Sequence, residues 1–487
     1  METSSSLSFL LTVPLLAVVI SWVIPKALQR LYAIFGSSLI LALTVYETAG
    51  ILFSAGTETA KVFFVDQRLE WVPELGLSVG FRLDGVSAWL LVLSALTTVV
   101  AFCLRGSWYR KQPRLFVSMG FFLLFALNSA FLATDLITFY LSYEAVFIPM
   151  IFMVGVWGEQ QKASAVFRFF LMSFAGSILM LVAMFQLMSL HHAATGQWSS
   201  HLSDILKVTS GKSSAELFWP CLGFFLAFAI KVPLVPFHGW LKAVYVNAPM
   251  PGTIWMSAIL SKLGVAGVIR FMLPLFPGVL KEHQGILLAL SAVSVIYAAL
   301  LAIRADDGKT LLAYSSISHL GFVMLGLFSL SSEGMNAAIL LSVGHAVTSG
   351  LLFFLLHQVE ERAGNFDLGA SKGLAANYPV LFAGMFVAVL ASVSLPGTLN
   401  FGGEFLVLLN AYRASALCTI LAGAGVVLGA VYMLRFFQKL ALGASESAGA
   451  DLAMAKKDLS VTDLLLVALL IGVVIYGGIN PGIFMKG

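Results

Sequence analysis

The stretch AFAIKVPLVPFHGWL, residues 227–241, places one lysine and two prolines inside an otherwise apolar segment. Proline has no amide N–H and its ring clashes with the preceding helical turn, so Pro233 and Pro236 prevent a continuous helix here. Non-helical backbone at membrane depth is tolerated only where it is buried in protein or lines a wet cavity. The stretch therefore predicts a broken membrane helix beside Lys231, a device that transporters use to expose backbone dipoles to ions.

A second stretch, SLPGTLNFGGEF at residues 394–405, predicts another interruption, at Pro396 and Gly397, shortly before Glu404. Interrupted spans in corresponding positions of two halves indicate an inverted-repeat transporter. The two interruptions fall in the seventh and twelfth predicted spans, so they are five spans apart. That spacing predicts two inverted five-helix repeats, residues 115–275 and 284–437, each with a discontinuous helix and a charge beside its break.

The composition indicates that lipid is the solvent of this chain. Its 487 residues are 59% hydrophobic and 11% charged, with a mean hydropathy of +0.95, whereas soluble domains carry about 25% charged residues. The net charge of +4, without a basic run interleaved with aromatics, indicates no nucleic-acid partner. No glycine-rich nucleotide motif and no cysteine spacing typical of an iron–sulfur cluster or zinc is present, so we expect no cofactor and no metal in this chain.

Counting apolar stretches of about 20 residues gives about 14 spans and predicts an all-α, polytopic membrane protein. An N-terminal three-helix region, residues 1–114, would precede the repeats, and a cytoplasmic segment with the last helix, residues 438–487, would follow them. Alternate loops hold roughly 17 and roughly 8 Lys and Arg residues, which satisfies the positive-inside rule and predicts that both termini face outward.

Ionisable residues inside spans are the candidate functional residues, because a charge at the bilayer centre costs at least about 2.5–3.5 kcal/mol. A lysine beside an ionised glutamate keeps its proton and loses that support when the partner is neutralised, so Glu144 and Lys231 would form a switchable pair. Lys262 and His319 would relay the proton laterally, and Glu404 would release it. Simpler structural roles stay open: a Glu–Lys pair can hold helices together, a lysine can reach the interface, and nearby Ser and Thr can satisfy a histidine. The full set of candidates is Glu144, Lys231, Lys262, His319, His345 and Glu404, with His238 behind them.

Four stretches resemble the antiporter-like membrane subunits of respiratory complex I, the NADH:quinone oxidoreductase. They are LSYEAVFIPMIFMVGVWG (141–158), AFAIKVPLVPFHGWL (227–241), KTLLAYSSISHLGFVMLG (309–326) and SLPGTLNFGGEFLVLL (394–409). The resemblance runs from about Phe81 to Phe437. It implies proton transfer by Glu144, Lys231 and Lys262, with His319 and His345 on a central hydrophilic axis.

Position 404 discriminates between branches of this family. Sister subunits and Mrp-type antiporter chains usually carry lysine there, so Glu404 favours the branch that carries glutamate. The resemblance implies a proton-pumping subunit that couples quinone reduction elsewhere to proton export and performs no redox chemistry itself. NADH, FMN, iron–sulfur clusters and quinone would be bound by partner subunits of the membrane and peripheral arms. The expected location is the bacterial inner (cytoplasmic) membrane.

One loop departs from the family pattern. The family usually reads WLPDAHVEAPTAGS where residues 240–253 read WLKAVYVNAPMPGT, so Ala243, Tyr245 and Asn247 replace an Asp, a His and a Glu. Three alternatives stay open, and the altered loop supports the second of them. They are a subunit of a Mrp-type cation/proton antiporter, an energy-coupling membrane chain of a hydrogenase or inorganic-carbon uptake complex, and a purely structural membrane scaffold.

Overall fold

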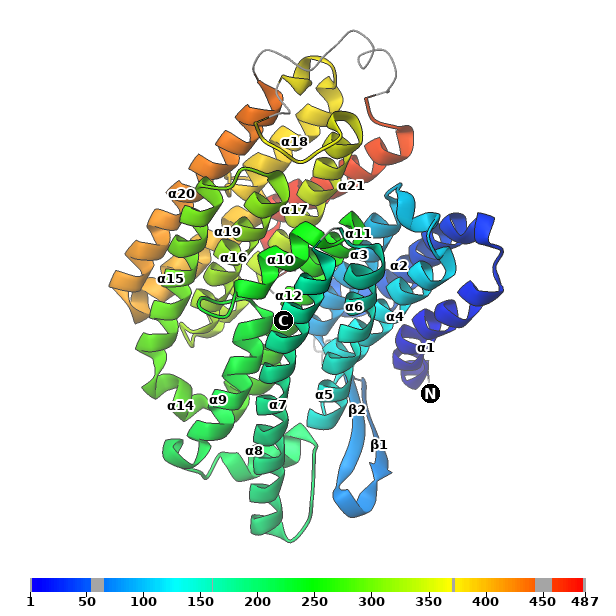
Figure 1. Ribbon diagram of the computed structural model, residues 1–487. Coiled ribbons are helices and arrows are strands. Elements are labelled where there is room, and N and C mark those ends of the chain that lie inside the picture. The colour runs from blue at the N-terminus through cyan, green and yellow to red at the C-terminus, as the bar shows by residue number, and fades with distance from the viewer. Residues whose placement is uncertain (1, 54–64, 160, 370–372, 443–457, 485–487) are drawn as a thin grey trace.

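The computed structural model describes residues 2–53, 65–159, 161–369, 373–442 and 458–484, and these form a bundle of long helices with one β-hairpin (Figure 1). The elements up to the first predicted break are α1 (Glu2–Val23), α2 (Gln29–Phe53), β1 (Val65–Val72), β2 (Leu77–Leu83), α3 (Gly85–Cys103), α4 (Pro113–Leu132), α5 (Leu136–Ala145), α6 (Phe147–Trp157), α7 (Lys162–Thr195), α8 (Leu202–Thr209) and α9 (Ser214–Lys231). The elements after it are α10 (Gly239–Asn247), α11 (Met250–Trp255), α12 (Ser261–Gly267), α13 (Leu273–Leu275), α14 (Pro277–Glu282), α15 (Gln284–Ile303), α16 (Gly308–Leu327), α17 (Ser332–Ala363), α18 (Pro379–Ser392), α19 (Leu399–Ala414), α20 (Ala416–Ala441) and α21 (Val461–Ile479).

The helices match the predicted spans. Within the described residues, 12 helices are long and apolar enough to cross a membrane, and two shorter apolar helices, Leu7–Val23 and Pro379–Ser392, accompany them. Together these segments coincide with the about 14 spans counted from the sequence. The prediction of a helical membrane bundle is therefore confirmed. The predicted cytoplasmic segment lies partly outside the described residues, because residues 443–457 are not among them.

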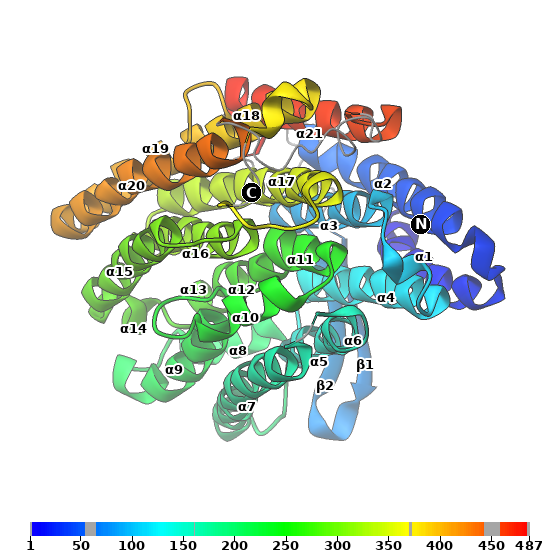
Figure 2. The same cartoon turned by 45° about the horizontal axis from the view of Figure 1, so that its top comes forward.

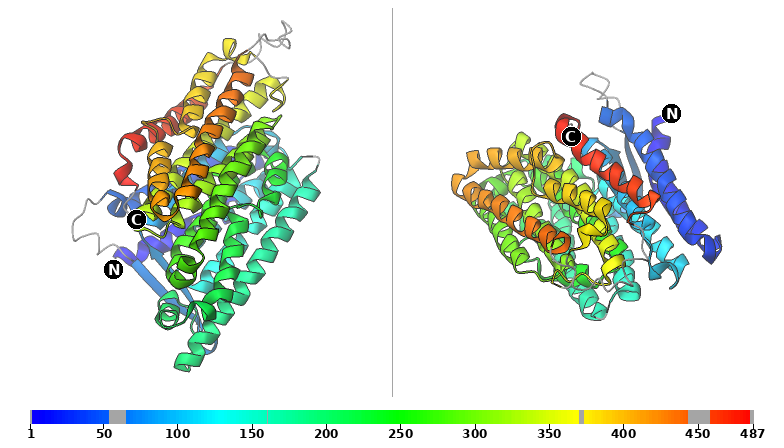
Figure 3. Two further views of the ribbon diagram at one scale, coloured as in Figure 1. Left: turned by 90° about the vertical axis from the view of Figure 1, so that its left-hand side faces the viewer. Right: turned by 90° about the horizontal axis from the view of Figure 1, so that it is seen from above.

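The bundle is organised around α17, which is buried along its length and packs against α3, α16, α18 and α19. The N-terminal helices α1 and α2 form one flank, and α15 and α20 form the other (Figures 2 and 3). α7 packs along α9, and α15 packs along both α16 and α20. Residues from several distant segments can therefore meet around α16 and α17.

The β-hairpin was not predicted from the sequence. β1 and β2 pair antiparallel at one end of the bundle, beside α8 (Figure 1). The hairpin is stabilised from outside, because the Thr134 N–H donates to Gly80 O (2.9 Å) and the Ser78 hydroxyl donates to the carboxylate of Asp135. Asp135 also caps α5, the role expected for an acidic residue at a helix start. These long-range contacts leave no pattern in the sequence around residues 65–83.

Both predicted helix breaks are present and share the same backbone pattern. α9 ends at Lys231 and α10 begins at Gly239, while α18 ends at Ser392 and α19 begins at Leu399. In each break an N–H reaches back five residues: the N–H of Leu234 donates to Ala229 O (2.8 Å), and the N–H of Leu395 donates to Leu390 O (3.0 Å).

A side chain covers one carbonyl that each break leaves open. The Trp240 indole N–H donates to Ile230 O (2.9 Å), and the Asn400 amide donates to Ala391 O (2.9 Å). A buried carbonyl without a partner would cost free energy, so these donors make the irregular backbone tolerable inside the bundle. Because the two breaks are built alike, they can serve similar purposes in the two halves of the chain.

The span that carries Lys262 contains two π-helical segments, which were not predicted. They are η5 (Met256–Leu260) and η6 (Val268–Met272), and they flank α12. Such segments are rare inside α-helices and are frequent at functional sites. Here they displace the residues around Lys262 from a regular helical path.

Candidate functional site

Four of the six candidate residues form a continuous buried line. Lys262 Nζ lies 2.7 Å from His345 Nδ1, and His319 Nδ1 lies 2.9 Å from Glu404 Oε1. The two imidazole rings lie between these contacts, with their centroids 5.5 Å apart and their planes at 63°. All four side chains are buried. His345 therefore lies between Lys262 and His319, the two residues that were predicted to relay a proton.

Each member of this line comes from a different element. Lys262 lies on α12, His345 on α17, His319 on α16 and Glu404 on α19. The Lys262 ammonium also donates to Ser257 O (2.9 Å), a carbonyl of the π segment η5. The π segment therefore supplies an acceptor that orients the lysine toward His345.

The hydrogen bonds assign the tautomer of His319. Because the Glu404 carboxylate only accepts, His319 Nδ1 carries the proton in that contact. The other nitrogen, Nε2, is then free to accept, and the Ser392 hydroxyl lies 3.5 Å from it at the end of α18. His319 can therefore take a proton on one nitrogen while it gives one from the other.

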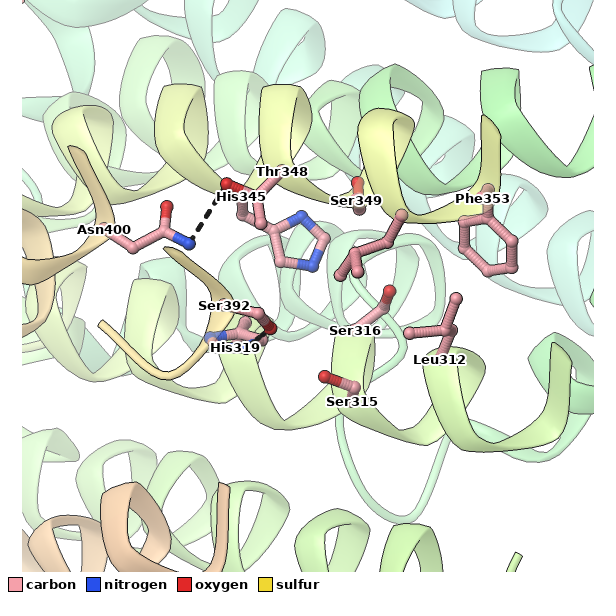
Figure 4. Close-up of a pocket in the computed structure, with 11 residues that line it drawn as sticks. Leu312, Ser315, Ser316, His319, His345, Thr348, Ser349, Phe353, Ser392 and Asn400 are labelled. Atoms are coloured by element: carbon pink, nitrogen blue, oxygen red, sulfur yellow. Dashed lines mark hydrogen bonds between the residues drawn. The ribbon is translucent and has the colours of Figure 1, made fainter. Parts of the chain in front are cut away.

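A small polar cavity lies between α16 and α17 at the histidine pair (Figure 4). Its volume of about 10 Å³ is close to the space that one water needs. Side chains of the two helices face each other across it, and Asn400 reaches its near end, where its amide lies 3.3 Å from the Thr348 hydroxyl. A water here could join the two histidines, whose rings are not hydrogen-bonded to each other. The lining residues are Leu312, Ser315, Ser316, His319, His345, Thr348, Ser349, Leu352, Phe353, Ser392 and Asn400.

Lys231 lies in an aromatic cage instead of a direct ion pair. Its Nζ is 3.7 Å from the ring centroid of Phe147 and 4.4 Å from that of Tyr143, and it has no hydrogen-bond partner. Ring faces stabilise a desolvated ammonium by about 2 kcal/mol or more. Glu144 follows Tyr143 directly, and its Oε1 is also buried without a partner. The two charged groups lie near each other but are not in contact.

The break between α5 and α6 positions both rings of this cage. Pro149 cannot donate to the carbonyl of Ala145, so the helix is interrupted at Val146. Tyr143 then lies on the last turn of α5 and Phe147 begins α6. The proline that follows Glu144 in the sequence therefore helps to shape the surroundings of Lys231.

Lys309 is a buried charge that the sequence reasoning did not single out. It begins the motif KTLLAYSSISH on α16 and is 2% exposed. Its position near the start of a predicted span concealed it, because lysine is common where a helix leaves the membrane. Lys309 contacts the altered loop, because its ammonium donates to the carbonyls of Val246 and Ala248. Between them, Asn247 replaces the family's Glu; its neutral side-chain oxygen accepts the Gln161 N–H (3.0 Å).

At the hairpin end of the bundle, Arg270 on η6 is bound to the carboxylate of Asp84 and donates to the carbonyls of Phe131 (2.7 Å) and Ala133 (3.2 Å). His238 lies apart from the buried line, with its ring against Tyr297. Across the described ranges no group of three or more His, Cys, Asp or Glu residues could hold a metal ion. The chemistry that the arrangement offers is proton transfer between nitrogen and oxygen atoms.

Apolar spans, two broken helices and a buried line of lysine, histidine and glutamate side chains together define an antiporter-like membrane subunit. More specifically, the chain belongs to the family of NADH:quinone oxidoreductase and Mrp antiporter transmembrane subunits, whose model matches residues 133–429. The resemblance seen in the sequence is thereby confirmed.

A relative and one solved structure bear out this membership. The chain is 34% identical to NADH-quinone oxidoreductase subunit M of Rickettsia conorii over 459 residues, 94% of this chain and 90% of the relative. It is 33% identical to a chain of respiratory complex I from Thermus thermophilus, with a TM-score of 0.84 over 97% of this chain and 96% of that one. A chain of the Mrp complex from Dietzia sp. shares the fold alone, with a TM-score of 0.83 and 19% identity over 100% of this chain and 96% of that one.

Proposed function

We propose that this chain is a proton-translocating, M-type subunit of an NADH:quinone oxidoreductase and that it couples quinone reduction in the complex to proton export. The observation that carries the proposal is the line from Lys262 through His345 and His319 to Glu404. Holding two helices together would require only one pair of opposite charges. Four buried titratable groups in series are costly in a membrane and form a pathway for protons. Glu404 itself favours this reading over a Mrp-type subunit, which usually carries lysine there.

The geometry supports a proton transfer in defined steps. The Lys262 ammonium gives its proton to His345 Nδ1 along the 2.7 Å contact. A water in the cavity carries a proton from His345 to His319 Nε2, while Nδ1 releases its own proton to Glu404. Lys262 would receive its next proton from the side of Lys231. This is supported by the close packing of α12 on the end of α9, where a Cβ atom at Gly264 would lie 3.2 Å from Lys231 Cβ and 3.2 Å from Phe228 O. A neutralised Glu144 weakens the charge on Lys231 and starts this step.

We infer that residues 115–275 and 284–437 are inverted repeats that follow the N-terminal region 1–114. The matched backbone bonds of the two breaks support this inference. The charges differ in position: Lys231 precedes its break, whereas Glu404 follows its own. Because inverted repeats run the two interrupted spans in opposite directions, both charges would lie on the outer side of their breaks.

The proposed orientation is a bacterial inner membrane with both termini outside. One end of the bundle gathers basic loops, because Arg30 binds Cys103 O, Arg114 binds Ile24 O and Lys111 binds Val156 O. The positive-inside rule assigns this basic end to the cytoplasm. The opposite end carries the hairpin, and the contact of Phe484 with Trp89, near the start of α3, brings the C-terminal part of the chain to that end.

NADH, FMN, iron–sulfur clusters and quinone would be held by partner subunits, since the proposed chemistry of this chain needs only protons. The test is purification of the assembled complex, identification of its subunits by mass spectrometry, and proton pumping in membrane vesicles with Lys262→Met. Partners that bind flavin and iron–sulfur clusters, together with lowered pumping in Lys262→Met, are the expected result. Unchanged pumping in that variant, or antiporter chains as the sole partners, would overturn the proposal.

A further inference from the structure

A buried lysine lies behind a solvent-facing carboxylate at the basic end of the bundle. The Lys309 ammonium donates to Glu159 Oε1 (3.0 Å), to Val246 O (3.3 Å) and to Ala248 O (3.2 Å), and it lies 4.4 Å from the ring centroid of Phe366. The side chain of Lys309 is 3% exposed, whereas that of Glu159 is 53% exposed. The pair therefore connects solvent to a buried cation in one contact.

Lys309 lies on the same helix face as the histidine site. Ser316 and His319 follow it by seven and ten residues on α16, which is helical spacing and corresponds to roughly 10 and 15 Å along the axis. Residues that line the small cavity are spread along most of this interval. This lining begins at the histidine pair and extends to Leu312 and Phe353 at its far end (Figure 4).

A short apolar closure separates the cavity from the lysine. Leu312 and Phe353 line the far end of the cavity (Figure 4), and Leu312 follows Lys309 by less than one helical turn. The ring of Phe353 is held by Tyr245, at a centroid distance of 5.8 Å. Water that entered this single turn would connect Lys309 to Ser316 and then to the histidines.

We propose that Glu159 and Lys309 form a second proton-uptake branch, which feeds His345 and His319 along α16 without passing through Lys231. This inference rests on the proposed proton-translocating function. Lys309 releases its proton to water in the closure, and the water delivers a proton to an imidazole nitrogen of His345. Glu159 then takes a proton from the cytoplasm and passes it to the neutral Lys309, which restores the ion pair.

The acceptors around Lys309 suit both of its protonation states. An ammonium has three donors, which match one carboxylate and two carbonyls, and a neutral amine keeps two donors for the two carbonyls. Losing the proton therefore breaks only the bond to Glu159. Other titratable residues belong to the elements packed around the pair: Lys162, Lys242, Asp306, Asp307 and Asp367. Asp307 caps the start of α16 with its side chain. The ion pair of Lys309 is made with Glu159.

The test compares Glu159→Gln with Glu360→Gln in inside-out membrane vesicles that contain the complete complex. Glu360 is a matched control, because it is 33% exposed and contacts another buried basic group, His357. The initial rate of proton uptake per NADH oxidised is measured at external pH 6.5 and 8.5. We expect Glu159→Gln to equal the wild type at pH 6.5 and to be at least about threefold slower at pH 8.5, where protons are scarce. Glu360→Gln should match the wild type at both values.

Two further variants separate the possible failures. Lys309→Met should slow uptake at both pH values, and exposed Lys242→Met should not. A Glu159→Gln rate that equals the wild type at both pH values, or that falls equally at both, would overturn the branch and leave Lys309 as a structural clamp. If Lys309→Met does not assemble, the pH comparison of the two glutamate variants still decides. Normal uptake in His319→Gln would refute the underlying function, because both branches pass through His319, whereas lost uptake there with wild-type behaviour of Glu159→Gln would refute this branch alone.

Discussion

The substitution Gly403→Ala should separate α19 from α17 and withdraw Glu404 from His319. A Cβ atom at position 403 would lie 2.7 Å from Cα and Cβ of Leu341 and 2.8 Å from its backbone nitrogen. Carbon atoms prefer roughly 3.5–4.0 Å, and the backbone of a buried helix cannot yield, so α19 would move by about 1 Å. Overpacking of this kind costs about 1–3 kcal/mol. Because Glu404 is the next residue, its 2.9 Å contact with His319 would exceed hydrogen-bond length.

The neighbouring Gly402→Ala is the control for this prediction. Its Cβ would lie 3.4 Å from a side-chain carbon of Leu340 and 3.7 Å from Pro481, which are ordinary contacts. Thermal stability of the complex and proton pumping per NADH oxidised are measured for both variants. A displacement of about 1 Å at a reacting group can cost about 100-fold in rate, so Gly403→Ala should lose most pumping and Gly402→Ala should retain it. Equal pumping in the two variants would refute the proposed contact between Glu404 and His319.

Two further predictions concern the ends of the path and the outer face. Glu144→Gln should lower proton pumping by about tenfold or more while the complex still assembles, because Lys231 loses the negative charge that supports its ammonium; unchanged pumping would contradict the switch. Burial alone would raise the pKa of Asp204, but hydrogen bonds from Ser199, Lys207 and Arg68 outweigh it and lower that pKa. The contact of α8 with the hairpin is therefore stabilised above the unfolded pKa of about 3.9 and loses that support as the pH falls through the lower folded value. Asp204→Asn should speed amide hydrogen exchange in β1 at neutral pH. An unchanged exchange rate would show that the ion pairs of Asp204 do not stabilise the hairpin.

The sequence was sufficient for the spans and for the two broken helices, because local chemistry decides both. Twenty apolar residues need lipid or a core, and Pro233 and Pro236 cannot continue a helix wherever they lie. The candidate residues followed from the cost of burying charge. That cost is a property of the residue type and its position in a span, so it can be read without knowing any contact.

The contacts between those residues could not be read in the same way. His319 and Glu404 are 85 residues apart, and His345 enters between Lys262 and His319 because α17 packs against α16. The π segments around Lys262 were not predicted either, although Pro274, two residues after the second segment, cannot donate to the carbonyl of Arg270. The separation of two residues along the chain does not predict which helices will pack against each other.

Lys231 shows a second limit of sequence reasoning. A lysine and a glutamate in neighbouring spans suggest an ion pair, yet the ammonium lies over the rings of Phe147 and Tyr143. The sequence stretch around Glu144 contains both rings, but only the break at Val146 turns them toward Lys231. Lys309 was overlooked for the opposite reason, since it lies at a span end where lysines are usually solvated.

The most direct test of the proposed relay is the number of protons translocated per NADH oxidised by the intact complex carrying His319→Gln. His319 joins the two halves of the buried line, so its loss should lower this ratio well below the wild-type value while the complex stays assembled. His283→Gln is the control, because His283 lies outside the line, where its Nδ1 contacts Val279 O (3.0 Å). A ratio for His319→Gln equal to that of the wild type and the control would contradict proton transfer through this line.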